Sequence, residues 1–226
     1  MTATASCLGA AAGCSFGPTS AAAERPANAY SYVAEAVQPS VPIYSAPGGT
    51  VTRRLANPNE FHDRLALLAT GRSGNWLKVL LPVRPNGSTG WVPLTSVQLS
   101  WDPWRVSVDL SAHRLTLYNV GRPVMHTKVG VGADSTPTPR GTFYLTSLLQ
   151  PPDPHGGYGP FAFGLSGYSP VLKSFAGGPG QLGLHGTDAT WSIGRSVTHG
   201  CIRVANKVIR MLAGRLPLGT PVVVTA

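Results

Sequence analysis

The sequence predicts a mainly β protein in two parts, with one or two short helices. Its 226 residues suffice for one large domain or two small ones, each with a real hydrophobic core. Only 12% of the residues are charged, whereas 27 glycines and 21 prolines supply turns along the whole chain. A hydrophobic content of 42% argues against wholesale disorder. The composition also argues against a coiled coil and a membrane channel.

Residues 31–100 predict the first part, a small barrel of short strands. Gly-Gly at 48–49 and Pro-Asn-Gly at 85–87 are typical turn sequences. Between such turns, residues 76–80 and 90–93 carry aromatic and β-branched residues at strand-like spacing. Short strands separated by turns favour a barrel over a helical unit.

Three segments of this part resemble a bacterial SH3-like module. They are residues 41–47 (Val-Pro-Ile-Tyr-Ser-Ala-Pro), 75–79 (Asn-Trp-Leu-Lys-Val) and 89–92 (Thr-Gly-Trp-Val). The resemblance implies binding of cell-wall peptides, since modules of that family often bind them. A packing or spacer barrel without a ligand of its own is the alternative.

The second part begins after residues 101–104 (Trp-Asp-Pro-Trp), which we expect to be a linker because proline interrupts the strand pattern. Alternating apolar residues over 106–110 and 115–117 then predict a hairpin. Further strands are expected over 124–131 and 142–145, with a rigid proline turn between them.

The last third of the chain combines a long irregular segment with a short helix. Fifteen of the 33 residues from 151 to 183 are Gly or Pro, which predicts a long functional loop, such as a lid over a site. Apolar residues from 204 to 212 repeat at helical spacing, with Asn206 as the expected N-terminal cap and Gly214 as the stop. A buried strand is expected over residues 220–224.

The formal net charge of +9 favours contact with a polyanion. Nucleic-acid binding would also need a clustered basic face or stacking aromatics, and the spacing shows neither, so we expect no nucleic-acid partner. An anionic polymer of the cell envelope fits a mildly basic surface better. No stretch has the roughly 18 consecutive apolar residues that cross a bilayer.

The start of the sequence indicates export. Residues 1–23 consist almost entirely of Ala, Thr, Ser, Gly and Cys and end in Ala-Ala-Ala, like the cleavage region of an export signal, but a basic start and a Leu-rich stretch are missing. We expect residues 1–30 to be an export leader or a low-complexity tail. Residues 8–14 also resemble a bacterial lipobox, with Cys14 as the lipidated residue. An incidental cysteine is the alternative.

The three cysteines cannot all pair within one chain. Cys7 and Cys14 lie in the expected leader, which leaves Cys201 alone. A lone thiol in an oxidising compartment is either buried and inert or kept for chemistry.

The residues around Cys201 favour chemistry. A thiol becomes a nucleophile when an imidazole takes its proton, and both His185 and His199 could do so. Gly200 lets the backbone approach a substrate and leaves N–H groups free to stabilise an oxyanion. Arg203 offers a fork of donors that suits a carboxylate. Spacing alone does not decide between the two histidines.

Two questions about these residues remain open at this point. A further acceptor, such as the carbonyl of Gly186, could align the ring of His185. A zinc site made of His185, His199 and Cys201 is the rival interpretation. It lacks the usual close ligand pairs and a carboxylate second shell, so we expect no metal and no cofactor.

The same segments resemble the signature of the L,D-transpeptidases, the YkuD-type catalytic domain of bacterial envelopes. The resemblance is carried by residues 185–187 (His-Gly-Thr), 192–194 (Ser-Ile-Gly) and 198–203 (Thr-His-Gly-Cys-Ile-Arg), and by an opening over 106–118 and 138–143. It spans residues 104–226. It implies a β-rich catalytic domain, in which Cys201 attacks the L,D-peptide bond of a peptidoglycan tetrapeptide stem and expels D-Ala. An amine of another stem then resolves the thioester and gives a 3→3 cross-link.

The resemblance also implies a role for each matched residue. Cys201 is the nucleophile, His185 the general base, and Gly186 orients that base through its carbonyl. His199, Gly200 and Arg203 shape the oxyanion and substrate site. Thr198, which stands where serine is commoner, completes the substrate-binding set.

The expected biology follows from this resemblance. The protein would be exported, act as a monomer at the cell envelope, and serve cell-wall biogenesis and cell shape. The alternative function is that of a wall-binding protein with an idle catalytic domain.

Overall fold

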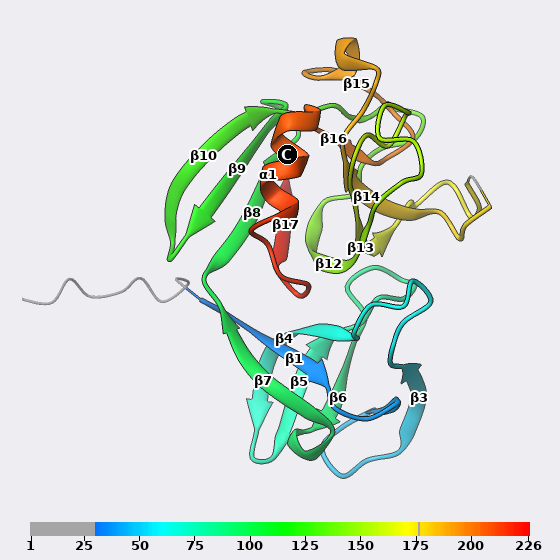
Figure 1. Cartoon of the computed structure of the whole chain (residues 1–226). Coiled ribbons are helices and arrows are strands. Elements are labelled where there is room, and N and C mark those ends of the chain that lie inside the picture. The colour runs from blue at the N-terminus through cyan, green and yellow to red at the C-terminus, as the bar shows by residue number, and fades with distance from the viewer. Residues whose placement is uncertain (1–29, 176) are drawn as a thin grey trace, which may run out of the picture.

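The structure is a computed structural model that describes residues 30–175 and 177–226. The leader expected over residues 1–30, with Cys7 and Cys14, lies outside the described residues except for Tyr30. The prediction of a mainly β protein is confirmed, since two large sheets contain most of the strands and the described residues form a single α-helix. Figure 1 shows the two parts, one above the other. Within the described ranges, no helix is long and apolar enough to cross a membrane.

The first part is a seven-stranded sheet with the order β3-β2-β6-β5-β4-β1-β7. Its strands are β1 (Ser31–Ala36), β2 (Ser40–Tyr44), β3 (Val51–Ala56), β4 (Ala66–Ser73), β5 (Trp76–Leu80), β6 (Thr89–Pro93) and β7 (Val97–Asp102), with a 3-10 helix (Leu94–Ser96) before the last strand. All pairings between these strands are antiparallel. The sheet encloses its own core of buried aliphatic residues, among them Val41, Leu67 and Val79. The resemblance of this sheet to an SH3-like module stays a prediction.

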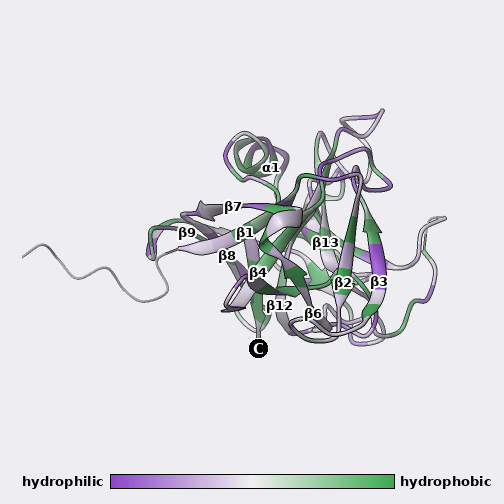
Figure 2. Ribbon diagram, turned by 90° about the horizontal axis from the view of Figure 1, so that it is seen from below, coloured by the Kyte–Doolittle hydropathy of each residue, from purple (hydrophilic) through white to green (hydrophobic). Residues whose placement is uncertain are grey.

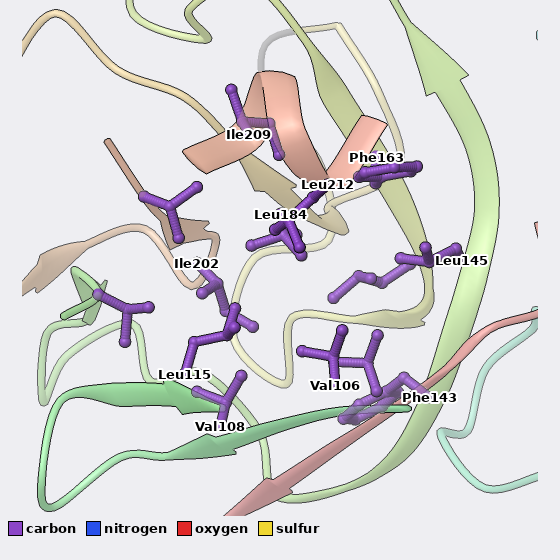
Figure 3. Close-up of a cluster of buried hydrophobic side chains, with 14 of the residues drawn as sticks. Val106, Val108, Leu115, Phe143, Leu145, Phe163, Leu184, Ile202, Ile209 and Leu212 are labelled. Atoms are coloured by element: carbon purple, nitrogen blue, oxygen red, sulfur yellow. The ribbon is translucent and has the colours of Figure 1, made fainter. Parts of the chain in front are cut away.

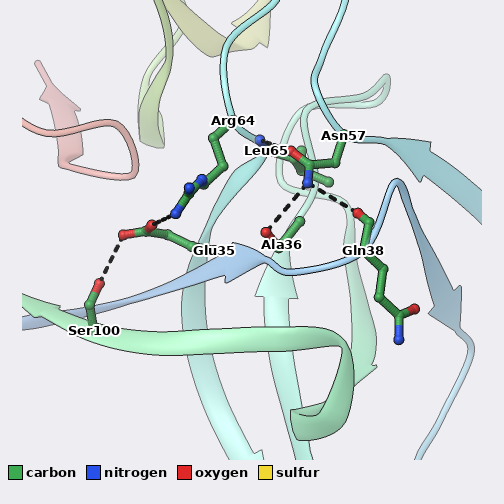
Figure 4. A network of polar contacts seen from close by, with 7 residues as sticks. All are labelled: Glu35, Ala36, Gln38, Asn57, Arg64, Leu65 and Ser100. Carbon is green, nitrogen blue, oxygen red and sulfur yellow. Dashed lines mark hydrogen bonds and ion pairs between the residues drawn. The ribbon is translucent and has the colours of Figure 1, made fainter.

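A polar cluster fixes the loop between β3 and β4 to strand β1 (Figure 4). The amide of Asn57 donates to the carbonyl of Gln38 at 3.0 Å and accepts from the backbone N–H of Leu65 at 3.0 Å. Arg64 forms an ion pair with Glu35 at 3.2 Å. Because the Arg64 side chain is largely exposed, the ion pair contributes little, and the backbone contacts of the half-buried Asn57 hold the loop.

Strand β3 lies at one edge of this sheet and is polar in its middle (Figure 2). Arg53 and Arg54 are both exposed there. Charged side chains on an edge strand disfavour pairing with the edge of another molecule.

The prediction of a linker over residues 101–104 is wrong. Trp101 and Asp102 end strand β7, and Trp104 begins β8 (Trp104–Asp109), so only Pro103 separates the two sheets. The carboxylate of Asp102 is buried, accepts from the N–H of Trp104 at 2.9 Å and from the hydroxyl of Thr220 at 2.6 Å. Burial raises the pKa of Asp102, and these two bonds oppose the rise. The junction is therefore a hydrogen-bonded part of the fold.

The second part contains an eight-stranded sheet with the order β10-β9-β8-β17-β12-β13-β14-β16. Its other strands are β9 (Arg114–Asn119), β10 (Arg122–Lys128), β12 (Gly141–Leu149), β13 (Ala162–Tyr168), β14 (Gln181–His185), β16 (Ile202–Arg203) and β17 (Pro221–Thr225). A separate two-stranded sheet joins β11 (Val131–Gly132) and β15 (Ser196–Thr198), and a 3-10 helix covers Thr190–Ser192. The predicted hairpin is confirmed as the antiparallel pair β8 and β9, and the C-terminal strand β17 lies parallel to β8.

The alternation that predicted the hairpin also builds the core of this part (Figure 3). Val106, Val108 and Leu115 point inward and are fully buried. They pack with Phe163 and Leu184 from the other half of the sheet. Burying such side chains contributes roughly 1.5–3 kcal/mol each, so this core fixes the strands that carry the site.

Strand β12 lies between the two hydrophobic cores. Phe143 and Leu145 belong to the core of the second part, whereas Tyr144 is fully buried in the core of the first. Successive side chains of a strand point to opposite faces, so one strand can serve both cores. The two parts therefore share a strand as well as a junction.

The long loop expected over 151–183 is only partly correct, because strand β13 runs through its middle. Gly164 and Gly167 belong to that strand and let it pack closely on neighbouring side chains. A Cβ at Gly164 would collide with the hydroxyl of Ser147, and one at Gly167 with the ring of Phe143. The glycines therefore mark close packing as well as loops.

Helix α1 (Asn206–Ala213) is confirmed near the predicted position, and Gly214 ends it by donating to the carbonyls of Arg210 and Leu212. The prediction that Asn206 caps the helix is wrong. Ala205 occupies the cap position, and the Asn206 side chain accepts from the backbone N–H of Thr187 at 2.8 Å. The helix start is thus tied to the predicted His-Gly-Thr segment.

Candidate active site

Two short parallel strands bring the predicted nucleophile and base together. His185 is the last residue of β14, and Cys201 immediately precedes β16. The two strands pair with Leu184 opposite Ile202 and His185 opposite Arg203. His185 and Cys201 lie sixteen positions apart in the sequence, and this strand pairing brings them together.

His185 is buried, with only 3% of its surface exposed. Its Nδ1 lies 2.6 Å from the carbonyl oxygen of Gly186. Because that oxygen can only accept, Nδ1 carries the proton and Nε2 is left with a lone pair. Burial lowers the pKa of His185 to about 4, against a smaller upward effect of the Gly186 bond and a further lowering by Arg203. The imidazole is therefore neutral at pH 7 and able to accept a proton.

Cys201 is half-buried and lines the same two cavities as His185. A Cβ on Gly183 would lie 3.7 Å from the sulfur and 3.6 Å from Cδ2 of His185, so both side chains border the same point above that glycine. Burial raises the pKa of the Cys201 thiol, while a hydrogen bond from the backbone of Gly183 and the charge of Arg203 oppose the rise. At pH 7 the resting pair is a neutral thiol and a neutral imidazole.

Threonine hydroxyls shape the turn that carries Cys201. Thr198 is buried, and its Oγ1 donates to the carbonyl of Cys201 at 2.7 Å and accepts from the N–H of Gly200 at 3.2 Å. The hydroxyl of Thr138 donates to the carbonyl of Gly200 at 2.8 Å. Gly200 has φ +113°, a conformation that favours glycine. The expectation of a free amide at Gly200 therefore differs from the structure, because a hydroxyl two residues earlier accepts from it.

Arg203 places a cation beside the thiol. Its backbone exchanges two hydrogen bonds with Gly130, at 2.8 and 2.9 Å, which fixes the start of the side chain. Among the described residues, its Nε is buried without a hydrogen-bond partner. The side chain lines a smaller cavity with Cys201 and His185, where a carboxylate could pair with it.

His199 lines the smaller cavity with His185 and Cys201 but is placed differently from His185. It is exposed, and its ring stacks on Phe175 at a centroid distance of 4.9 Å. Tyr158 instead packs against the imidazole of His185, with ring centroids 4.8 Å apart. The geometry thus places His185 as the candidate base and His199 at the rim.

An open cavity of about 520 Å³ leads to these groups. Its walls are mostly apolar and come from the loops before and after strand β13, from β13 and β14 themselves, and from the first part of the chain. Its lining includes Phe61, Phe175, Gly178, Pro179, His185 and Cys201. A cavity of this size holds a peptide-sized ligand and is lined as ligand sites usually are.

Comparison with known proteins gives this constellation a family. A family model of the YkuD L,D-transpeptidase catalytic domain matches residues 103–224, more than half of the chain. The chain belongs to this family. The resemblance expected from residues 104–226 is thereby confirmed.

Curated relatives agree with the family match. A Bacillus licheniformis protein named for L,D-transpeptidase YkuD is 35% identical over 123 residues, which cover 54% of this chain and 66% of that protein. The corresponding Bacillus subtilis protein is 33% identical over 122 residues, with the same coverage. The chain thus spans slightly less than two thirds of the length of these relatives.

Solved structures of L,D-transpeptidases are also similar. One from Enterococcus faecium is 24% identical, covers 54% of this chain and 49% of its own, and has a TM-score of 0.42. One from Mycobacterium tuberculosis is 16% identical, covers 72% of this chain and 90% of its own, and has a TM-score of 0.47.

The rival interpretation of His185, His199 and Cys201 was a zinc site. Within residues 30–175 and 177–226, no group of three or more His, Cys, Asp or Glu side chains is arranged to hold a metal ion. His199 stacks on Phe175 and is exposed, whereas His185 is buried, although both line the smaller cavity with Cys201.

Several residues of the site escaped the sequence analysis. Thr138, Tyr158 and Phe175 come from distant segments and contact the predicted residues only after folding. The Thr-Pro-Thr-Pro motif around Thr138 gave a signal, since we predicted a rigid turn there. Nothing in the sequence linked the two aromatic residues to the site.

Proposed function

We propose that this protein is a cysteine-dependent L,D-transpeptidase that cross-links peptidoglycan stem peptides. The observation that carries the proposal is the pairing of β14 with β16, which sets the neutral imidazole of His185 beside the thiol of Cys201 at one cavity. Membership of the L,D-transpeptidase family supports the substrate class.

In the first half of the reaction, Nε2 of His185 takes the thiol proton as the sulfur of Cys201 attacks the carbonyl carbon of the L,D-peptide bond. The tetrahedral intermediate collapses when the imidazolium returns this proton to the leaving amine of D-Ala. A thioester remains on Cys201. Because the resting pair is neutral, proton removal accompanies the attack, as in general-base catalysis.

In the second half, an acceptor amine attacks the thioester carbonyl and gives its proton to His185. The C–S bond breaks, and the sulfur recovers the proton from the imidazolium. The products are a 3→3 cross-link and the free enzyme. Arg203 would pair with a substrate carboxylate, and the N–H of Gly200 could stabilise the oxyanion only by leaving the hydroxyl of Thr198.

Intact mass spectrometry with a tetrapeptide donor tests the proposal. The wild-type protein should gain the mass of the donor without D-Ala, and Cys201→Ala should gain none. His185→Ala should acylate at least about a hundredfold more slowly, the usual contribution of a positioned base. A wild-type protein that stays unmodified while both it and Cys201→Ala bind purified sacculi would instead favour a wall-binding protein with an idle catalytic domain.

We also propose that the protein is exported and acts at the envelope as a monomer, in cell-wall biogenesis and cell shape. The site uses groups of a single chain, which supports the monomer. Cell fractionation and analytical ultracentrifugation test these two statements.

A further inference from the structure

One wall of the cavity is held in place by the first part of the chain. The wall is the loop between β13 and β14, of which residues 169–175 and 177–180 are described. We call it the wall loop. Its two ends meet where the N–H of Ser169 donates to the carbonyl of Gly180 at 2.8 Å.

Arg84 of the first part joins both ends of the wall loop. Its guanidinium donates to the carbonyl oxygen of Ser169 at 2.7 Å, of Leu172 at 3.0 Å and of Pro179 at 2.9 Å. These three carbonyls lie more than 80 residues away in the sequence. One side chain thus connects the first and the last residues of the wall loop.

A second clasp next to Arg84 fixes its position. Asn86 exchanges two hydrogen bonds with the backbone of Tyr168, at 2.8 and 2.9 Å. The hydroxyl of Tyr168 donates to the carbonyl of Pro82 at 2.9 Å, and its ring lies 4.9 Å below the guanidinium of Arg84. The guanidinium therefore has a defined direction.

The far end of the wall loop reaches the reacting groups. Phe175, Gly178 and Pro179 line the cavity that contains Cys201, and Phe175 stacks on His199. The N–H groups of Phe175 and Gly178 donate to each other's carbonyls, at 3.0 and 2.9 Å. Any shift at the root of the loop would move this wall against a bound substrate.

We propose that Arg84 is a positioning residue for the donor substrate, acting through the wall loop. The first part of the chain then completes the substrate site, and Phe61 from the same part contributes directly to the cavity. This inference rests on the proposed function. It assigns the first part a role within the enzyme, beside any ligand of its own.

A guanidinium suits this role better than an ammonium. It is planar and directs several N–H donors along fixed lines, so that it can serve three carbonyls at once. Lysine would present a point charge on a flexible stem and could not reach all three in one geometry. We therefore expect Arg84→Lys to restore only part of the effect.

The test compares Arg84→Ala with Arg72→Ala and the wild-type protein. Arg72 is an exposed arginine on strand β4 of the first part. Its Nε donates to the carbonyl of Gly74 within its own hairpin at 3.0 Å. The measurements are KM and kcat for D-Ala release from the tetrapeptide, the rate at which iodoacetamide alkylates Cys201, and hydrogen exchange of residues 169–175.

We expect Arg84→Ala to raise KM about tenfold with kcat changed less than about threefold, as for lost substrate positioning. Hydrogen exchange of the wall loop should accelerate, while alkylation by the small reagent stays within about twofold because it needs no wall. Arg84→Lys should lie between, and Arg72→Ala should match the wild type. Arg84→Lys also serves if Arg84→Ala unfolds.

The inference and the proposed function fail in different ways. A wild-type protein that releases no D-Ala overturns the proposed function. A working wild-type enzyme whose KM and loop exchange are both unchanged in Arg84→Ala overturns the inference. An equal loss of donor acylation and of alkylation would mean that Arg84 supports the fold alone, and would overturn it as well.

Discussion

The burial of His185 predicts a specific loss of stability in acid. The folded-state pKa of about 4 lies below the ordinary value of 6.5, so the unfolded chain binds a proton first as the pH falls. The contribution of His185 to stability is fully present above pH 6.5 and is lost as the pH falls through about 4. At about 1.4 kcal/mol for each pKa unit, the whole loss amounts to about 3 kcal/mol.

Most of this loss occurs between pH 7 and pH 5. By pH 5 the linkage relation gives about 2 kcal/mol, because the unfolded histidine is then charged and the folded one is still neutral. Asp102 has the opposite sign, since its pKa is raised in the folded state and protonation favours folding. Asp102 is the same in the wild type and in a variant of His185, so the difference between the two proteins isolates the histidine.

Urea unfolding at pH 7, 6 and 5 measures the effect in the wild type and in His185→Asn. Asparagine keeps an N–H donor near the position of Nδ1 and has no titrating group. The wild type should lose about 2 kcal/mol more than the variant over this interval, and the matched control His199→Asn, at an exposed site, should behave like the wild type. Equal pH slopes in the wild type and His185→Asn would refute the assignment of a buried neutral imidazole.

Two further predictions concern the thiol and the junction. Burial raises the pKa of Cys201, so the rate of its alkylation by iodoacetamide should have a midpoint above pH 9.0. Arg203→Gln should move that midpoint higher, because the positive charge that lowers the pKa of Cys201 is removed. A midpoint at or below pH 9.0 in the wild type would contradict this. Thr220→Val leaves the buried Asp102 carboxylate with one donor fewer, so the free energy of unfolding at pH 7 should fall by about 2 kcal/mol. An unchanged urea midpoint would show that the carboxylate does not depend on this bond.

The sequence predicted those parts of the fold and the site that depend on residues close together in the chain. The alternation of Val106, Val108 and Leu115 predicted the hairpin and its inward face, because every second side chain of a strand points to the same face. The segments around His185 and Cys201 gave the site, since a thiol, imidazoles and glycines so close together indicate nucleophilic chemistry.

The features that escaped prediction depend on contacts between distant segments. Gly164 and Gly167 suggested a loop but belong to strand β13. They are glycines there because Ser147 and Phe143 leave no room for a Cβ. Asn206 is a residue type that often caps helices, but its side chain instead accepts a hydrogen bond from the backbone N–H of Thr187, in the His-Gly-Thr segment. Arg84 gave no signal at all, because its three partners lie in another part of the chain.

The neutral resting pair places a condition on the proposed chemistry. A thiolate formed in advance would need a raised pKa at His185 or a lowered one at Cys201, and burial moves both in the opposite direction. Nucleophilicity must therefore arise while the donor is bound, when Nε2 takes the proton along the reaction path. A base acting in this way depends strongly on the distance and direction of the attacked carbonyl. Walls such as the loop held by Arg84 then act on this step by holding the donor in the site, which is why we expect their loss to appear mainly in KM.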